Sequence, residues 1–388
     1  MIVRFWGVRG STPTPTTNYV KYGGNTPCVE VRTAAGQLII LDAGTGIRSL
    51  GQVLMRQAPP KGHRIMLFFS HYHWDHIQGI PFFEPMYVPN NFIYLHGFTT
   101  PDASIEKVLS DQMMAPFFPV DLSVMRATRN FYSVGEETLQ LGDAVITTRA
   151  LQHPQGCLGY RIEADGQTVV YATDHECGSA VHDRNLLELA DQADVLMMDT
   201  QYTSEEYPSK KGWGHSTWRD AVRICKEANV KLLVLFHHDP DHSDVFMDNL
   251  VLQAGREFGS VIGAMEGMEL DPSQSAEGTS YRPAFHKRYL DRYPVSIPAT
   301  VTISSGTVAQ QVLLENLSLD GSYFLTPTEV SVGQEIEFQL RFPGTDPNQP
   351  TKCQVRVVRV EKVGNQFGVG VSFRMAYVPS SLDVEELS

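Results

Sequence analysis

Runs of apolar residues that end abruptly in polar side chains recur along the first 270 residues of the chain. These runs predict strands at residues 1–8, 28–32, 38–41, 65–69, 139–141, 144–150, 158–163, 168–172, 195–198 and 231–236. Helical spacing predicts helices at residues 48–56, 102–114, 186–190 and 218–228. Thr100 and Pro101 would start the second of these helices, and Ser216 would cap the last one. Because continuous apolar strands are typical of sheets that are covered on both faces, the alternation of such strands with helices predicts a layered α/β domain.

The pattern changes at Asp271. Residues 271–280 are polar and rich in turn formers, and after them the chain alternates apolar and polar residues with little helical spacing. This alternation predicts strands at residues 295–303, 310–315, 323–325, 335–342, 353–360 and 367–373. Short strands at this spacing indicate a small six-stranded β-barrel. We therefore expect a first domain at residues 1–270, a linker at 271–282, a second domain at 283–377 and a tail at 378–388.

Charge and composition restrict the partners and the compartment. The formal net charge of −13 argues against a large nucleic acid held mainly through its phosphates, although a local basic patch stays compatible with it. The five cysteines are scattered and form no CxxC pair, which is typical of reduced thiols in a cytoplasmic protein. The chain starts without the apolar core of a signal peptide, and no apolar run reaches the about 18 residues of a membrane span. We expect a cytoplasmic protein that does not contact a membrane.

The densest candidate chemistry follows the strand at residues 65–69. Four metal-competent side chains, His71, His73, Asp75 and His76, lie there within six positions. Imidazole and carboxylate ligands suit Zn²⁺ and also Mn²⁺ or Fe²⁺. In an extended segment His71 and His73 point the same way and suit one ion, whereas Asp75 and His76 fall on the next turn and suit a second. The sequence therefore predicts a metal site.

Further polar candidates also stand just past predicted strands. Asp42 ends the strand at residues 38–41, and His153, Asp174 and His237 follow three later strands. The carboxyl ends of strands are where α/β sheets present ligands. We expect Asp42 to orient a ligand histidine rather than to serve only as a turn former.

The pattern HxHxDH, with Asp42 upstream and three further residues downstream, resembles that of the metallo-β-lactamase fold hydrolases over about residues 1 to 270. The resemblance implies an αββα sandwich that holds two divalent metal ions. By position, His71, His73 and His153 would bind the first ion, Asp75, His76 and His237 would bind the second, and Asp174 would bridge both. His237 is preferred because it directly follows its strand, and His238 is the alternative.

Within that superfamily, the stretch Gly214-His215-Ser216-Thr217 resembles the tRNA 3′-processing endonuclease and its phosphodiesterase relatives. The resemblance implies that His215 assists proton transfer or phosphate binding. The alternative is a helix-capping loop whose histidine only forms a hydrogen bond. Asp75 would orient or deprotonate the attacking water, and His215 would protonate the departing alkoxide. The opening residues 7–11, together with residues 22–26, resemble those of a bacterial branch of small-molecule or cyclic nucleotide phosphodiesterases.

Two further motifs accompany the β-rich part, one just before its first predicted strand and one after its second. Arg288 and Arg292 form RxxxR, and Asn316, Ser318 and Gly321 form NxSxxG. The pair resembles that of a PilZ domain, the bacterial receptor for cyclic di-GMP, over about residues 283 to 377. Arginines suit a ligand with two phosphates and two guanines, since guanidinium binds phosphate in a fork and stacks on purines. The alternative is a solvated basic run beside an ordinary turn.

The sequence thus predicts a two-metal phosphodiesterase that acts on a cyclic nucleotide or another small phosphodiester and is regulated by cyclic di-GMP. Zinc is the expected metal, with manganese or iron as alternatives. Three other functions stay open: an RNA-processing endonuclease, a non-catalytic cyclic di-GMP receptor, and a thioester or lactone hydrolase that uses the same metals. The exact substrate, the sign of regulation and the oligomeric state, a homodimer included, are not determined by the sequence.

Overall fold

A computed structural model describes residues 1–57, 59–99, 104–274, 293–303, 309–317, 321–340, 351–364 and 366–373. By its internal contacts the chain divides into two compact units, Met1–Ala284 and Phe285–Ser388. The predicted linker, residues 271–282, lies largely outside the described residues, so its bounds stay a prediction. None of the helices in the described ranges is long and apolar enough to cross a bilayer.

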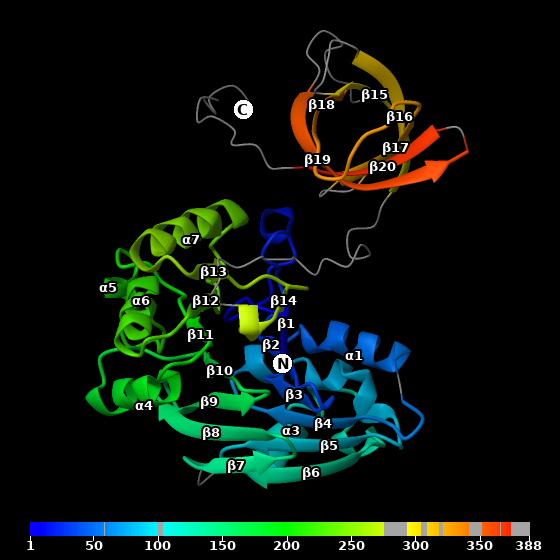
Figure 1. Ribbon diagram of the computed structural model, residues 1–388. Coiled ribbons are helices and arrows are strands. Elements are labelled where there is room, and N and C mark those ends of the chain that lie inside the picture. Colours follow the sequence, from blue (N-terminus) through cyan, green and yellow to red (C-terminus); the bar gives the residue numbers. More distant parts are fainter. Residues whose placement is uncertain are drawn as a thin grey trace. The chain divides into compact units, whose positions relative to one another are not determined.

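The first unit contains two seven-stranded sheets that face each other (Figure 1). The strands of the first sheet, in spatial order, are β14 (Glu269–Leu270), β1 (Ile2–Gly7), β2 (Cys28–Arg32), β3 (Leu38–Leu41), β4 (Arg64–Phe68), β5 (Phe92–Gly97) and β6 (Thr128–Ser133). Those of the second are β13 (Val261–Gly263), β12 (Leu232–Phe236), β11 (Val195–Asp199), β10 (Gln167–Ala172), β9 (Cys157–Ala164), β8 (Ala144–Leu151) and β7 (Thr138–Leu141). The main core lies between the two sheets, where inward residues of both pack together.

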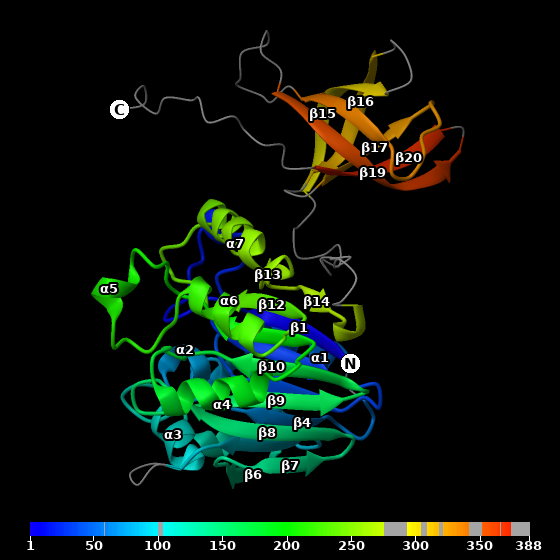
Figure 2. The ribbon, with the colours of Figure 1, turned by 60° about the vertical axis from the view of Figure 1, so that its left-hand side comes forward.

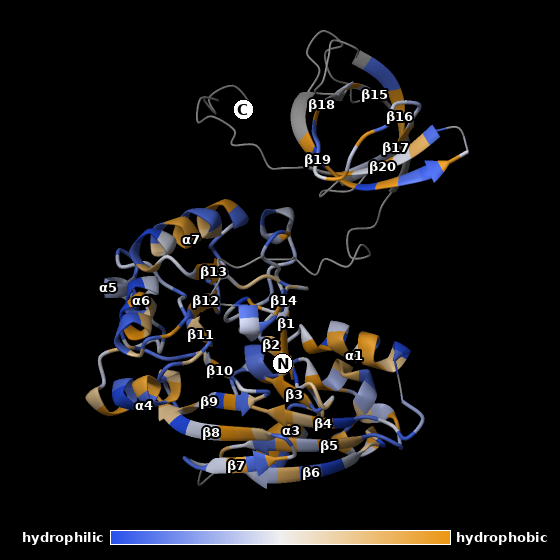
Figure 3. Cartoon of the chain, viewed as in Figure 1, coloured by the Kyte–Doolittle hydropathy of each residue, from blue (hydrophilic) through white to orange (hydrophobic). Residues whose placement is uncertain are grey.

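Helices cover the outer faces of both sheets (Figure 2). The α-helices of this unit are α1 (Ile47–Arg56), α2 (Trp74–Ile77), α3 (Ile105–Asp111), α4 (Ala180–Ala190), α5 (Tyr207–Lys210), α6 (Trp218–Glu227) and α7 (Asp244–Phe258). Helices α4, α6 and α7 pack on the second sheet, and α1 and α3 pack on the first. Along these helices hydrophobic and hydrophilic residues alternate (Figure 3), as expected when only one face of a helix is buried. The predicted αββα sandwich is confirmed.

Five of the strands that lead into the loops of the candidate site are paired in parallel. β3 pairs with β4, and β10, β11 and β12 pair successively, all in parallel register. Parallel pairing aligns the carboxyl ends of these strands at one edge of each sheet. The loops after β3, β4, β10, β11 and β12 therefore all open at the same end of the sandwich.

Two predicted helix starts are corrected by the structure. The helix expected at residues 102–114 is observed only at Ile105–Asp111, where Ser104 Oγ accepts from the Lys107 N–H, and Thr100 and Pro101 lie outside the described residues. Ser216 does not cap α6. Thr217 does, in a reciprocal capping box with Asp220. Ser216 instead donates its hydroxyl proton to the His175 carbonyl and accepts from the Cys177 N–H.

The second unit contains a closed six-stranded antiparallel barrel. Its strands are β15 (Tyr293–Ile303), β16 (Ala309–Leu317), β17 (Gly321–Thr326), β18 (Glu335–Leu340), β19 (Thr351–Val363) and β20 (Gln366–Phe373), joined in the order β15-β16-β17-β20-β19-β18. A separate core of inward aliphatic residues and Phe324 fills it. The predicted six-stranded barrel is confirmed.

Candidate metal centre

Each predicted ligand stands on a loop that follows a strand end. His71 and His73 follow β4, and Asp75 and His76 lie in the short helix α2 directly behind them. Three later segments, after β8, β10 and β12, add His153, Asp174 and His237. The structure brings all seven side chains into one cluster.

Three histidines form the first group of donors. His71, His73 and His153 offer nitrogen atoms that all lie within 4.8 Å of one another. His73 Nδ1 lies 3.1 Å from His153 Nε2. Asp174 Oδ1 is 3.8 Å from His71 Nε2 and 3.6 Å from His153 Nε2, so this carboxylate oxygen completes the group.

The second group combines two histidines with two carboxylates. His76 Nε2 and His237 Nε2 are 3.3 Å apart, and Asp75 Oδ2 lies 3.2 Å from the first and 3.3 Å from the second. Asp174 Oδ2 lies 3.2 Å and 3.3 Å from the same two nitrogens. The two oxygens of Asp174 therefore face different groups, which is the arrangement of a bridging carboxylate.

The outward nitrogens of three histidines are held by oxygen acceptors. His76 Nδ1 lies 2.8 Å from Asp42 Oδ2, and His153 Nδ1 lies 2.9 Å from the carbonyl oxygen of Gly214. His237 Nδ1 lies 2.9 Å from Gln201 Oε1. Because these oxygens only accept, each Nδ1 must carry the proton, and each Nε2 is left with a lone pair that faces the cluster.

The same reasoning applies to the first two histidines of the motif. Ser70 Oγ donates to Asp42 Oδ2, so it accepts from His71 Nδ1 at 3.0 Å. This leaves His71 Nε2 buried and without a hydrogen-bond partner. His73 is reversed: its Nε2 donates to Gln155 Oε1 at 3.0 Å, so the lone pair is on Nδ1. All five imidazoles thus direct a lone pair inward.

Inward lone pairs at these separations fit a divalent metal. Zinc–nitrogen bonds of about 2.0–2.1 Å in a tetrahedral site place neighbouring nitrogens about 3.3 Å apart, and the two closest nitrogen pairs here are 3.1 and 3.3 Å apart. Lone pairs that face each other repel, and an unpartnered buried nitrogen is costly. A shared cation removes both costs, so the donor set fits metal binding.

The protonation states of the two carboxylates and of His71 and His153 agree with that fit. At His76, by contrast, burial acts to lower the pKa, but Asp75, Asp174 and Asp42 raise it well above its usual value. Burial alone would raise the pKa of Asp174, but the surrounding His237, His76 and His71 hold it well below its usual range. Burial likewise acts to raise the pKa of Asp75, yet His76 and His237 lower it. Burial lowers the pKa of His71 and His153. The carboxylates are ionised and these two imidazoles neutral near pH 7, as ligands must be.

His215 lies beside the cluster as a protonated group. Its Nδ1 is 2.7 Å from Asp199 Oδ2 and 3.8 Å from Asp174 Oδ1. Burial alone would lower the pKa of His215, but Asp199 and then Asp174 raise it to about 9. Asp199 also accepts from the backbone N–H groups of Asp174 and Gln201, so it links the loops after β10 and β11.

Sequence reasoning missed Asp199 and Gln201 as site residues. Asp199 is the last residue of β11, so the rule that selected Asp42 and Asp174 would also have selected it. Gln201 and Ser11 carry no comparable signal. The Ser11 N–H donates to Asp75 Oδ2 at 2.8 Å, and its contact depends on a loop that is distant in sequence.

Strained backbone is concentrated at the cluster. Among the described residues eight non-glycine residues have a left-handed φ, and five of them belong to this site: Ser11, Asp42, Gln155, Asp174 and His237. Left-handed φ angles are uncommon outside glycine and persist where the surrounding structure imposes them. Their concentration here is typical of a functional site.

A cavity of about 460 Å³ opens onto the cluster. Ser11, Tyr72, Trp74 and Gln155 line it together with side chains of both donor groups and His215. His238, the alternative ligand, lies elsewhere: its Nε2 donates to the carbonyl of Ala264 at 2.8 Å. The structure thus brings His237, and not His238, to the cavity.

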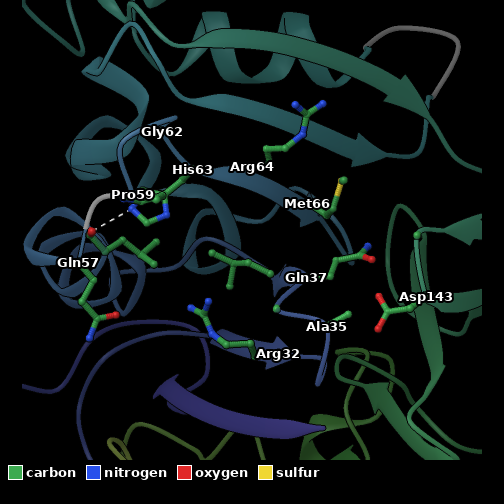
Figure 4. A pocket seen from close by; sticks show the side chains of 14 residues that line it. Arg32, Ala35, Gln37, Gln57, Pro59, Gly62, His63, Arg64, Met66 and Asp143 are labelled. Carbon is green, nitrogen blue, oxygen red and sulfur yellow. Dashed lines mark hydrogen bonds between the residues drawn. The ribbon is translucent and has the colours of Figure 1, made fainter.

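A larger cavity, about 670 Å³, lies at the opposite ends of β3 and β4 (Figure 4). Three of its polar side chains have partners, whereas the buried Gln37 Nε2 has none among the described residues. Arg32 is paired with Glu30, Arg64 donates to the Tyr94 hydroxyl, and the His63 ring is bonded to the Leu54 carbonyl. The cavity therefore shows no reactive group.

A further group of potential metal donors consists of His175, Cys177 and Asp183. Its protonation favours a structural role over metal binding. His175 Nδ1 accepts from the Gln152 N–H, so its proton is on Nε2, which faces Asp183 at 3.2 Å. Burial raises the pKa of the Cys177 thiol to about 12. The lone pair and the thiolate that a metal needs are both missing.

Of the residues predicted to bind cyclic di-GMP, only two are described, and only by their backbone. Asn316 lies in β16, where it pairs with Pro294 and Tyr323, and Gly321 begins β17. Arg288, Arg292 and Ser318 lie outside the described residues.

Comparisons with known proteins agree with this geometry. The model of the β-lactamase superfamily domain matches residues 37–238, and that of the PilZ domain matches residues 285–381. Ribonuclease Z of Thermoplasma acidophilum is 23% identical over 313 residues, covering 69% of this chain and 95% of that protein.

Two solved structures share the fold of the first unit. The metallo-β-lactamase fold protein YhfI from Bacillus subtilis is 22% identical with a TM-score of 0.52, covering 69% of this chain and 98% of YhfI. A diphosphatase from the PhnP family is 18% identical with a TM-score of 0.50, covering 70% and 97%.

Proposed function

The chain belongs to the β-lactamase superfamily and carries a PilZ domain, so it is a metal-dependent hydrolase, and we propose that it hydrolyses small phosphodiesters under the control of cyclic di-GMP. The observation that carries the proposal is the position of Asp174, with one carboxylate oxygen toward each donor group. Two groups that share a carboxylate suit a pair of divalent ions.

We assign the ligands accordingly. His71, His73 and His153 hold one ion, Asp75, His76 and His237 hold the other, and Asp174 bridges them. Asp42 orients His76 through its bond to Nδ1. Five imidazoles and two carboxylates favour zinc, with manganese or iron as weaker candidates. Bound there, two divalent ions supply Lewis acidity toward a phosphate oxygen and lower the pKa of bound water.

Protein side chains supply the proton transfers. Asp75 is ionised and is held by the Ser11 N–H, so it is placed to orient the attacking water or to accept its proton. His215 is protonated and lines the cavity, so it donates a proton to the departing alkoxide. Phosphodiester hydrolysis needs both transfers and no nucleophilic side chain.

The size of the cavity and the charge of the chain favour a small substrate. About 460 Å³ is at the lower end of ligand pockets, and the formal net charge of −13 disfavours binding through many phosphates. An RNA-processing endonuclease is the second candidate, because curated relatives are named ribonuclease Z.

The test uses the full-length chain loaded with zinc, manganese or iron. Its substrates are cyclic mono- and dinucleotides, linear dinucleotides and a precursor tRNA with a 3′ extension. We expect metal-dependent turnover of at least one small diester, lost on chelation. Cleavage of the precursor alone would favour the second candidate, and no turnover of any substrate would contradict both.

Cyclic di-GMP binding is proposed for the PilZ domain, through Arg288, Arg292, Asn316, Ser318 and Gly321. Titration calorimetry should detect binding to the full-length chain and its loss in Arg292→Ala, because a guanidinium that contacts phosphate or guanine cannot be replaced by a methyl group. Turnover with and without saturating cyclic di-GMP then tests regulation. Equal kinetic constants in both conditions would contradict regulation by cyclic di-GMP.

A further inference from the structure

One aromatic side chain at the metal centre has no structural role. Trp74 is the first residue of α2, between the candidate ligands His73 and Asp75, and it lines the 460 Å³ cavity. Its side chain is 77% exposed, the highest value among the exposed large hydrophobic residues in the described ranges. Tryptophan is on average highly buried, so an indole left in water at a site entrance needs an explanation.

The indole is free, whereas the backbone below it is fixed. The Trp74 carbonyl accepts from the Gln78 N–H, the His76 N–H donates to the His73 carbonyl, and the His76 carbonyl accepts from Ala43. In the part of the chain that the structure describes, no hydrogen bond, ring contact or cation contact engages the Trp74 ring. A rigid short helix thus presents an unoccupied aromatic face beside the reacting centre.

The rest of the cavity wall limits what that face can bind. None of the nine residues that line the cavity has an aliphatic side chain. An acyl chain would therefore find no aliphatic wall, which disfavours a thioester or lactone with a long tail. A flat aromatic ring needs only a ring to lie on, and stacking on an aromatic side chain accepts any nucleobase.

We infer that Trp74 is the stacking platform for a nucleobase, so that the substrate of this centre is a nucleotide phosphodiester rather than a base-free one. This inference rests on the proposed phosphodiesterase function. Trp74 touches the base and not the reacting atoms, so it determines specificity through binding. Its removal should raise KM for base-bearing substrates much more than it lowers kcat.

The experiment compares two diesters with the same leaving group, thymidine 5′-(p-nitrophenyl phosphate) and methyl p-nitrophenyl phosphate. For metal-loaded full-length protein we measure the ratio of KM for the methyl ester to KM for the thymidine ester. Stacking of one base corresponds to about 5- to 150-fold in affinity. In Trp74→Ala the ratio should fall by a factor in this range, and Trp74→Phe should keep most of it.

Phe117→Ala is the matched control, since Phe117 is also an exposed aromatic residue but does not line the cavity. Its ratio should equal that of the wild type. If Trp74→Ala changes both KM values equally, or changes neither, the inference is wrong, but the proposed phosphodiesterase function is not affected.

A second readout does not need turnover. Thymidine 5′-monophosphate should quench tryptophan fluorescence of the wild-type chain, and the quenching should be absent in Trp74→Phe, which still stacks but lacks the indole. If the enzyme cleaves neither p-nitrophenyl diester, this titration alone decides the inference, and the substrate panel above still decides the proposed function. Equal quenching in the wild type and in Trp74→Phe would overturn it.

Discussion

Single hydrogen bonds decide which nitrogen of each histidine faces the cluster. At His153 the acceptor is a backbone carbonyl, and at His76 it is the carboxylate of Asp42, which also accepts from the Ser70 N–H and the Tyr171 hydroxyl. At His215 the partner is again a carboxylate, which raises the pKa of this imidazole to about 9, and we propose that it serves as an acid instead of a ligand. The outer contact therefore decides which nitrogen of an imidazole carries the proton, and the position of the other nitrogen relative to the cluster separates a candidate ligand from the candidate acid.

The role of His215 as an acid predicts a dependence on the leaving group. His215→Gln should lower kcat about 10²- to 10⁴-fold for a nucleotide diester that releases an alkoxide. For bis(p-nitrophenyl) phosphate the loss should be far smaller, because p-nitrophenolate leaves without being protonated. Steady-state kinetics of both substrates provide the check. An equal loss for both would mean that His215 binds phosphate and does not transfer a proton.

The Asp199–His215 pair predicts the alkaline limb of the pH profile. With His215 as the proposed proton donor and its pKa raised to about 9, kcat/KM should be maintained below that pH and fall as the pH rises through about 9. Asp199→Asn removes the charge that raises this pKa most, so the limb should shift to lower pH. The profile of kcat/KM for a poor leaving group tests this. A limb that stays in place would assign it to another group.

Loops between elements hold these side chains more than the elements themselves do. The loop ahead of α6 is anchored by Glu176, which accepts from the N–H groups of Gly212 and Gly214 and from the Tyr207 hydroxyl. The Gly214 carbonyl in turn accepts from His153. The capping box of Thr217 then starts α6 directly behind His215. One loop thus fixes both a candidate ligand and the candidate acid.

Gly214 tests the importance of that loop. It has a φ of +91°, and a Cβ there would overlap the His153 ring. Gly214→Ala should therefore lower the affinity for the ion on the His71–His73–His153 group by about 10- to 100-fold. Metal content after dialysis against a competing chelator provides the measurement.

Gly212→Ala is the matched control for this substitution. Gly212 has a similar φ of +87°, but a Cβ there meets nothing within 4 Å. Both variants carry the same backbone strain, so only Gly214→Ala should lose metal. Equal loss in the two variants would assign the effect to the strain and not to His153.

In the described residues the two units share no hydrophobic core cluster. The clusters of the first unit draw only on residues up to Leu270, and the described core of the barrel draws only on residues from Ala299 to Val371. A unit with its own core unfolds as its own cooperative transition. Each ligand should therefore stabilise mainly the unit that binds it, and a smaller shift of the other transition would report the coupling that regulation requires.

Calorimetry of the full-length chain should resolve two transitions. Removal of the metal should mainly lower the transition of the sandwich, whereas cyclic di-GMP at 100 times its Kd should stabilise the barrel by about 2.7 kcal/mol. Arg292→Ala is the control, since it should abolish the second shift and leave the first. A single transition that both ligands move would contradict independent units.

The resemblance to the metallo-β-lactamase fold hydrolases supplied the αββα sandwich. The sequence pattern by itself determined a layered α/β domain, the barrel and seven polar residues that converge. These depend on local signals: apolar runs, helical spacing, and the rule that strand ends carry ligands. Helix starts were less certain, because Ser216 and Thr217 are equally good caps by composition, and only the backbone conformation selected Thr217.

Only the tertiary structure decided how these residues meet. His73 and His153 are 80 positions apart and follow β4 and β8, which belong to different sheets, so the packing of the two sheets against each other brings their loops together. The contacts of Ser11 with Asp75 and of Gln201 with His237, and the exposure of Trp74, follow from loop conformations that no periodicity encodes. The physical reason is range: hydrophobic patterns act between neighbours in sequence, whereas the direction of a lone pair depends on atoms that only the folded chain brings within 3 Å.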